Sequence, residues 1–313
     1  MSATLYFSKV NVVSHIYDIY DKPKELRKIL KKLLININND VKYEKQDVRV
    51  DEKGEVHEYN AVFKFRSIDK LDDKYNNAIV GNVVKKSLLF INDIDEKTNV
   101  VKKIPVENSE IIQFYFDVYR EVVVFYTTNR FGRKEFNDAF KELLTASMNK
   151  EEKGYNFEIS LIKPNLDIAD IKNELRKIGE LESLKIHIIP PNPDDELLDE
   201  ISNNGEEILE SMKEGNVTNK SIVFTSKSLR GLNLNAKIIN EEIGKINKIH
   251  SKLSGKKALG LGYASVEATS VDGKTFTTED TKPIKQKISE EEKTRGLFID
   301  VCKNKVLSII RML

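Results

Sequence analysis

Positively charged side chains are grouped in two parts of the chain, and phosphate binding is the chemistry that such groups could perform. Arg130, Arg133 and Lys134 lie around Phe131-Gly132, where a helix is expected to begin. The free backbone N–H groups of a helix N-terminus favour an anion, so these three side chains are candidate phosphate contacts. The second group lies between residues 227 and 257, where eight Lys or Arg and two Glu give a net charge of +6. Its candidate DNA contacts are Lys227, Arg230, Lys256 and Lys257.

An acidic segment precedes the second basic group. Residues 194 to 214 contain nine acidic side chains and one lysine, a net charge of −8. Charge runs are usually solvated helix faces, and two such faces could simply compensate each other. The alternative is a polyanion-binding strip beside an acidic segment that repels or regulates its ligand. The lysine-rich face of a helix expected over residues 24–34 is either an ordinary polar outer face or a further candidate phosphate contact. A membrane-surface helix is another alternative, but the flanking strands favour burial of its apolar face in a core.

Sequence motifs for catalysis, metal binding or cofactor binding are absent. Ser254-Gly255-Lys256-Lys257 resembles the end of a phosphate-binding loop, but His250 stands where that loop needs glycine, and no Ser or Thr follows Lys256. Gly260-Leu261-Gly262 lacks the third glycine of a dinucleotide-binding motif. The four histidines are scattered without metal-ligand spacing, and His187, in an apolar strand, is expected to be structural. We therefore predict no catalytic residue, no metal and no cofactor.

Composition limits the class of protein. The chain has 313 residues, 40% of them hydrophobic, and a formal net charge of +1, which excludes a uniformly basic nucleic-acid binder but not a segregated basic face. The single cysteine, Cys302, forms neither an intramolecular disulfide nor a thiolate zinc site, as is usual in a reducing compartment. The first residues lack the features of a signal peptide, and no run approaches 18 apolar residues. We expect a cytoplasmic protein without membrane insertion.

The order of expected elements predicts an α+β fold with a β-rich N-terminal half built on antiparallel sheet. A strand is expected at 4–13 and a helix after Pro23, and further strands follow up to a hairpin across Tyr119-Arg120. These strands are expected at 47–50, 55–66, 83–91, 99–104, 111–118 and 121–128.

The C-terminal half is expected to alternate strands and helices and to end in a β-hairpin and a helix. Asp167 and Gly179 should begin and end one helix, a longer helix is expected over 236–253, and Asp272-Gly273 should form the turn of a hairpin between 259–271 and 275–281. Ser289 and Glu292 read as the capping box of the last helix, which should bury Cys302. We predict domains at 1–128 and 129–313, with residues 259–313 packing on either one.

Two segments carry a resemblance to known proteins. Ile188-Ile189-Pro190-Pro191-Asn192-Pro193-Asp194-Asp195 and Gly262-Tyr263-Ala264-Ser265-Val266-Glu267-Ala268 resemble a bacterial family of unknown function found among phage-defence genes. The order of elements from Val122 onward is similar to that of the lambda phage-exclusion protein RexA. The resemblance implies a DNA-binding, homodimeric, two-domain protein that acts in abortive infection with a separate effector protein. It implies no catalytic residues.

The preferred hypothesis is therefore a sequence-nonspecific sensor that binds double-stranded DNA in a phage-defence system. One rival is a protein-interaction scaffold whose acidic and basic segments pair between subunits or with an effector. The other is a cryptic metal-dependent nuclease or toxin whose carboxylates are dispersed along the sequence.

Overall fold

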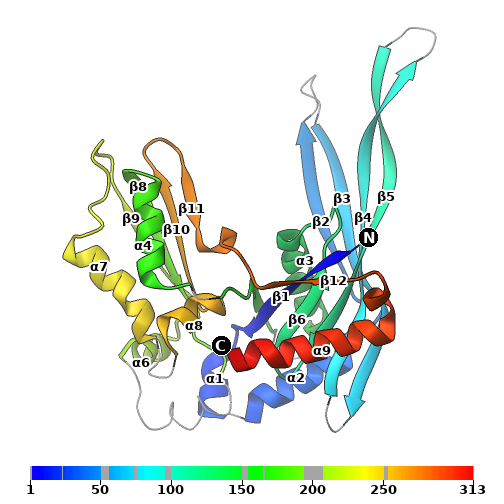
Figure 1. Cartoon of the computed structure of the whole chain (residues 1–313), viewed down its shortest axis with the longest axis horizontal. Coiled ribbons are helices and arrows are strands. Elements are labelled where there is room, and N and C mark those ends of the chain that lie inside the picture. Colours follow the sequence, from blue (N-terminus) through cyan, green and yellow to red (C-terminus); the bar gives the residue numbers. More distant parts are fainter. Residues whose placement is uncertain are drawn as a thin grey trace.

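The structure is a computed structural model of the chain. It describes residues 2–22, 24–50, 56–73, 76–95, 100–149, 154–164, 166–193, 207–249 and 253–312. Strands and helices fall into two lobes, each built on an antiparallel sheet (Figure 1). The predicted α+β class and its β-rich N-terminal half are confirmed. The acidic segment at 194–206 lies outside the described residues.

The large sheet has the order β12-β1-β6-β5-β4-β3-β2, and β7 also pairs with β1. Its strands come from both sides of residue 128, so both predicted domains contribute to it. One edge of β1 pairs with two strands, with β12 through Ala3–Tyr6 and with β7 through Ser8–Val12. The strand bounds are β1 Ala3–Val12, β2 Lys42–Val50, β3 Val56–Asp73, β4 Asn76–Asp95, β5 Val100–Asp117, β6 Val122–Tyr126, β7 Phe157–Leu161 and β12 Lys285–Ile288.

Helices cover both faces of the large sheet. Helices α2 (Lys24–Asn36) and α3 (Arg133–Met148) contribute to one apolar core, and α9 (Arg295–Met312) packs on the opposite face. The short helix α1 (Ile16–Asp21) joins the first core. Helix α2 forms because leucine and isoleucine recur at helical spacing and all point inward. These buried residues are Leu26, Ile29, Leu30, Leu33 and Leu34.

The small sheet has the order β11-β10-β8-β9. Alternate residues of β8, including Leu184, Ile186 and Ile188, are buried in the same core as the surrounding helices. The 3-10 turns η1 (Lys245–Lys248), η2 (Thr278–Asp280) and η3 (Glu291–Lys293) complete the described elements. The bounds of this lobe are α4 Ile168–Lys177, β8 Leu181–Ile188, α6 Glu207–Glu214, β9 Lys220–Thr225, α7 Lys237–Gly244, α8 Gly255–Gly260, β10 Ala264–Ser270 and β11 Thr275–Thr277.

Several local predictions are confirmed. Asp167 caps α4, with Asp170 completing a capping box, and Gly179 follows the helix with a φ of 100°. Gly273 takes a φ of 78° in the turn between β10 and β11, a conformation that favours glycine. Cys302 is fully buried on the core-facing side of α9, and burial raises the pKa of its thiol well above the ordinary value.

Other local predictions are wrong. The strands expected at 99–104 and 111–118 are one strand, β5. Residues 255–260 form helix α8, so the preceding strand of the hairpin starts at Ala264, and the helix expected over 236–253 is the short α7 followed by η1. Ser289 and Glu292 do form reciprocal hydrogen bonds, but Glu292 belongs to the 3-10 turn η3, and α9 begins only at Arg295.

Candidate functional site

The seven predicted DNA contacts lie in three separate places. Lys227 and Arg230 follow β9 at the Leu181 end of β8, where Lys227 lies 3.7 Å from Glu182. Lys256 and Lys257 are in α8, near the Ile188 end of the same strand. With about 3.3 Å per residue, the two pairs are about 20 Å apart along the sheet. The basic segment 227–257 therefore does not form one strip.

The third predicted group lies on the large lobe, at the beginning of α3. Arg130 and Lys134 are exposed, whereas Arg133 is half-buried with its guanidinium 6.0 Å from the centre of the Tyr6 ring. Lys85 donates a hydrogen bond of 3.1 Å to the carbonyl of Arg130 and pairs with Glu135 at 2.7 Å. The charge of Lys85 is thus already neutralised by Glu135. The predicted group of Arg130, Arg133 and Lys134 lies on the α3 side of the sheet.

A fourth group of cations lies on the opposite, α9 side of the large sheet, and we refer to Lys42, Lys64, Arg66 and Lys86 as the sheet basic cluster. Lys42 is directly opposite Lys64, which is in turn opposite Val84, and Lys86 is the next β4 residue on that face. Helix α9 leaves this part of the face open, since the nearby Ile111 is 53% exposed. Sequence analysis missed the cluster because its members come from three strands.

The charge of the sheet basic cluster is only partly compensated. Lys42 pairs with Glu44 at 2.9 Å, whereas Lys64 and Lys86 form no ion pair with any residue in the described part of the chain. Partial desolvation, followed by repulsion from Arg66 and Lys86, lowers the pKa of Lys64. Like charges opposite each other destabilise a sheet, so an anion would relieve an unfavourable arrangement here.

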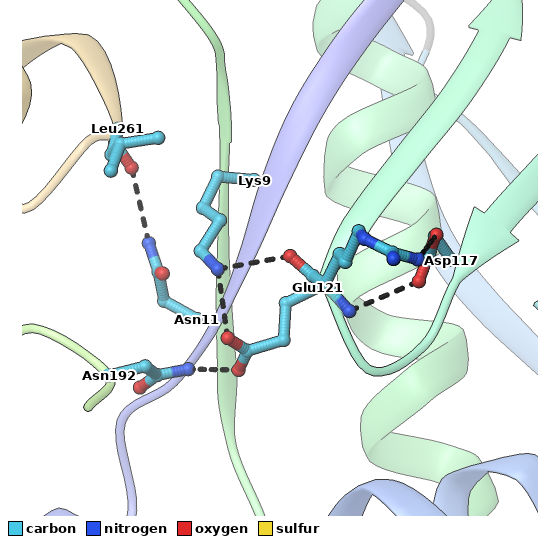
Figure 2. A network of polar contacts seen from close by, with 7 residues as sticks. Lys9, Asn11, Asp117, Glu121, Asn192 and Leu261 are labelled. Atoms are coloured by element: carbon cyan, nitrogen blue, oxygen red, sulfur yellow. Dashed lines mark hydrogen bonds and ion pairs between the residues drawn. The ribbon is translucent and has the colours of Figure 1, made fainter. Parts of the chain in front are cut away.

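A buried polar network joins the two lobes (Figure 2). The Lys9 ammonium lies 2.8 Å from the Glu121 carboxylate and donates a hydrogen bond of 3.2 Å to the carbonyl of Arg120. Asn192, from the Pro190-Pro191-Asn192-Pro193 segment, donates a hydrogen bond to the other Glu121 oxygen. Glu121 occupies the left-handed region with a φ of 56°. These contacts attach the segment after β8 to the β5–β6 turn and to β1.

Close backbone approaches complete the same junction. Asn11 donates a hydrogen bond of 3.4 Å to the carbonyl of Leu261 (Figure 2). A Cβ on Gly260 would lie 2.7 Å from the carbonyl oxygen of Lys163, and one on Gly262 would lie 2.4 Å from the Ser160 hydroxyl. The Gly260-Leu261-Gly262 segment therefore serves close contact between the lobes, which explains its glycines without a bound phosphate. The buried side-chain oxygens of Asn11 and Asn192 have no hydrogen-bond partner within the described residues.

His187 faces the uncovered side of the small sheet. Its Nδ1 lies 3.0 Å from the Ser221 hydroxyl. Burial, followed by the positive charge of Lys185, lowers the pKa of the imidazole, and nearby carboxylates oppose that shift. A cavity of about 310 Å³ lies between α3, β7 and the ends of β8 and β9, with Lys141 and Glu158 paired across it at 2.9 Å. No group of three or more His, Cys, Asp or Glu suited to a metal ion occurs in the ranges that the structure describes.

The model of a family described as a domain of unknown function, DUF4747, matches residues 52–305. The chain belongs to this family. The matched part of this DUF4747 protein includes Lys64, Arg66 and Lys86 of the sheet basic cluster and both Glu121 and Asn192 of the junction. No curated protein is matched by the chain. None of the helices in the described ranges is long and apolar enough to cross a membrane.

Proposed function

We propose that this DUF4747 protein binds the phosphate backbone of double-stranded DNA, independently of sequence, through the sheet basic cluster. The observation that supports the proposal is the convergence of Lys42, Lys64, Arg66 and Lys86 on one uncovered face, with Lys64 and Lys86 unpaired among the described residues. Such a face neutralises phosphates and releases their condensed counterions. A net charge of only +1 requires this attraction to be local.

The biological role that we propose is that of a sensor in a phage-defence system, acting with a separate effector protein. Its support is the sequence resemblance of the 188–195 and 262–268 segments. Residues of both segments contribute to the junction between the lobes, where Asn192 holds Glu121 and Gly262 approaches Ser160. A change in the relative position of the two lobes would have to alter these contacts.

Fluorescence anisotropy with labelled duplexes of unrelated sequence at about 50 mM salt tests DNA binding, because electrostatic binding is strong at low salt. Lys64→Glu/Lys86→Glu should weaken binding to all duplexes alike. Lys285→Glu/Lys287→Glu is a matched control, because these exposed lysines of β12 lie at the other edge of the sheet and the change in net charge is the same.

The competing sites have distinct outcomes in the same assay. Lys256→Glu/Lys257→Glu should have the larger effect if α8 carries the DNA contact, and Arg130→Glu/Lys134→Glu if the start of α3 does. No binding of the wild-type protein at about 50 mM salt would overturn the proposal and favour the scaffold. Cutting of the duplex upon addition of a divalent metal would favour the nuclease.

A further inference from the structure

The β4–β5 hairpin projects from the large sheet and separates from the neighbouring β2–β3 hairpin (Figure 1). Pairing of β4 with β3 ends at Lys86↔Val62, whereas pairing with β5 continues from Ser87↔Asn108 to Asp95↔Val100. These nine further residues of β4 correspond to about 30 Å at 3.4 Å per residue. We call this extension, residues 87–95 and 100–108, the arm. A two-stranded hairpin is marginally stable on its own, so an arm of this length needs a partner to be rigid.

Both faces of the arm expose apolar side chains. Ile91 and Ile104 are opposite each other on one face and are 46% and 37% exposed, and Ile94 and Val101 on the other are 60% and 58% exposed. Exposed apolar side chains on a long strand with an open edge are a known site of strand pairing. The composition of the arm therefore favours association.

The two edges of the arm differ in their ability to pair. The edge of β5 contains Pro105, which lacks an N–H group and fits a ladder only where that group would point away from the neighbouring strand. Pro105 therefore blocks the outer edge of β5. Phe90 is paired with Pro105, so this is a non-hydrogen-bonded pair, and the N–H and C=O of Phe90 also point away from β5. Because such pairs alternate along an antiparallel ladder, the N–H and C=O groups of Leu88 and Asn92 point the same way. Among the described residues, the outer edge of β4 in the arm therefore has a row of donors and acceptors that pair with no strand.

The charge along β4 indicates which strand fits this edge. Lys86 lies at the root of the arm, and Asp93 lies toward its tip, opposite Lys102 of β5, with the apolar residues 88–91 between them on β4. Lys85, beside Lys86, already pairs with Glu135 on the α3 side. A second copy of β4 running antiparallel would place Asp93 of each chain near Lys86 of the other. A parallel copy would bring like charges together. Antiparallel pairing of identical strands also follows the two-fold symmetry of most homodimers.

We propose that the outer edge of β4, over residues 87–95, pairs antiparallel with the same edge of a second copy of this chain, which continues the large sheet across a dimer. The described strands of the β2–β3 and β4–β5 hairpins separate beyond the Lys86↔Val62 pair (Figure 1). The interface and the proposed DNA surface meet at Lys86, so variants of Asn92 and Ile91, which leave the sheet basic cluster unchanged, are the ones that separate the two proposals.

Sedimentation velocity over a concentration series of the full chain tests the interface. Asn92→Pro removes an outward N–H of an exposed residue without breaking the β4–β5 ladder, and Asn92→Ala is the matched control. We expect a wild-type dimer, an Asn92→Ala dimer, and a dissociation constant at least about tenfold higher for Asn92→Pro. Ile91→Lys should also dissociate the dimer, because a charge on an edge strand opposes pairing.

The outcomes separate the two proposals. A wild-type protein that stays monomeric at all concentrations, or an Asn92→Pro protein that dimerises like wild type, would overturn the interface. Circular dichroism spectra of Asn92→Pro and Ile91→Lys should match the wild-type spectrum, because the arm lies outside the core. Retained DNA affinity per chain in the monomeric variants would show that DNA binding stands independently, whereas loss of DNA binding with the dimer intact leaves the interface supported.

Discussion

Strands β4 and β5 pass through two environments, because their central part is covered by helices and their extension, the arm, is not. Near the centre of the sheet, Phe65, Phe114 and Phe116 are fully buried under α3, and Tyr115 is buried on the opposite face. Farther along the same strands, isoleucines and valines remain exposed on the arm. Both regions contain large apolar side chains, so coverage by helices determines which of them stabilises the fold. The uncovered region is where we place both proposed interfaces.

The sharpest test of this contrast is a pair of truncations, one in each region. Phe140 of α3 contacts the rings of Phe65, Phe114 and Phe116 at centroid distances of 5.6, 5.1 and 5.6 Å. Phe140→Ala should reduce the free energy of unfolding by about 3–5 kcal/mol through lost packing and a cavity. Ile104→Ala on the arm should cost below about 1 kcal/mol. Urea unfolding measures both, and equal costs would show that the arm belongs to the core.

The junction between the lobes should show an intermediate effect. Asn192→Ala removes a hydrogen bond to the buried Glu121 carboxylate, which then keeps only Lys9 as a partner among the residues described. An unsatisfied buried group costs about 1–3 kcal/mol, and more when it is charged. Thermal unfolding followed by circular dichroism measures the loss. Glu121→Gln/Asn192→Ala is the matched variant, in which residue 121 carries no charge. A Tm for Asn192→Ala equal to that of the wild type would show that this hydrogen bond does not stabilise the junction.

The smallest expected effect concerns His187 on the open side of the small sheet. Its pKa in the folded chain lies below the ordinary value of 6.5, so the unfolded chain binds the proton more readily. Stability should therefore be fully present above about pH 6.5 and decrease as the pH falls below it. His187→Gln should flatten the pH dependence of the unfolding free energy between about pH 7 and 5, by less than about 1 kcal/mol. If the unfolding free energy of His187→Gln depends on pH as steeply as that of the wild type, other titrating groups cause the dependence.

The sequence allowed a correct prediction of the elements wherever periodicity and turn residues agree. Helix α4 between Asp167 and Gly179, and the Asp272-Gly273 turn, are local features of this kind. The sheet basic cluster could not be predicted in this way, because Lys42, Lys64 and Lys86 become neighbours only through the register of three strands. The segment 227–257 shows the converse, since charges that are near in sequence are separated by the length of β8. Local patterns predict elements, and pairing register decides which charges meet.

The salt dependence of DNA affinity shows whether the sheet basic cluster contacts DNA phosphates. For duplex DNA, log K falls with log salt concentration by about 0.9 for each phosphate that a protein neutralises. Lys64→Glu/Lys86→Glu removes two cations from the sheet basic cluster and should flatten the slope by about 1.8. The Lys285→Glu/Lys287→Glu control should keep the wild-type slope. An unchanged slope in the cluster variant, or an equal flattening in the control, would contradict DNA binding by this face of the sheet.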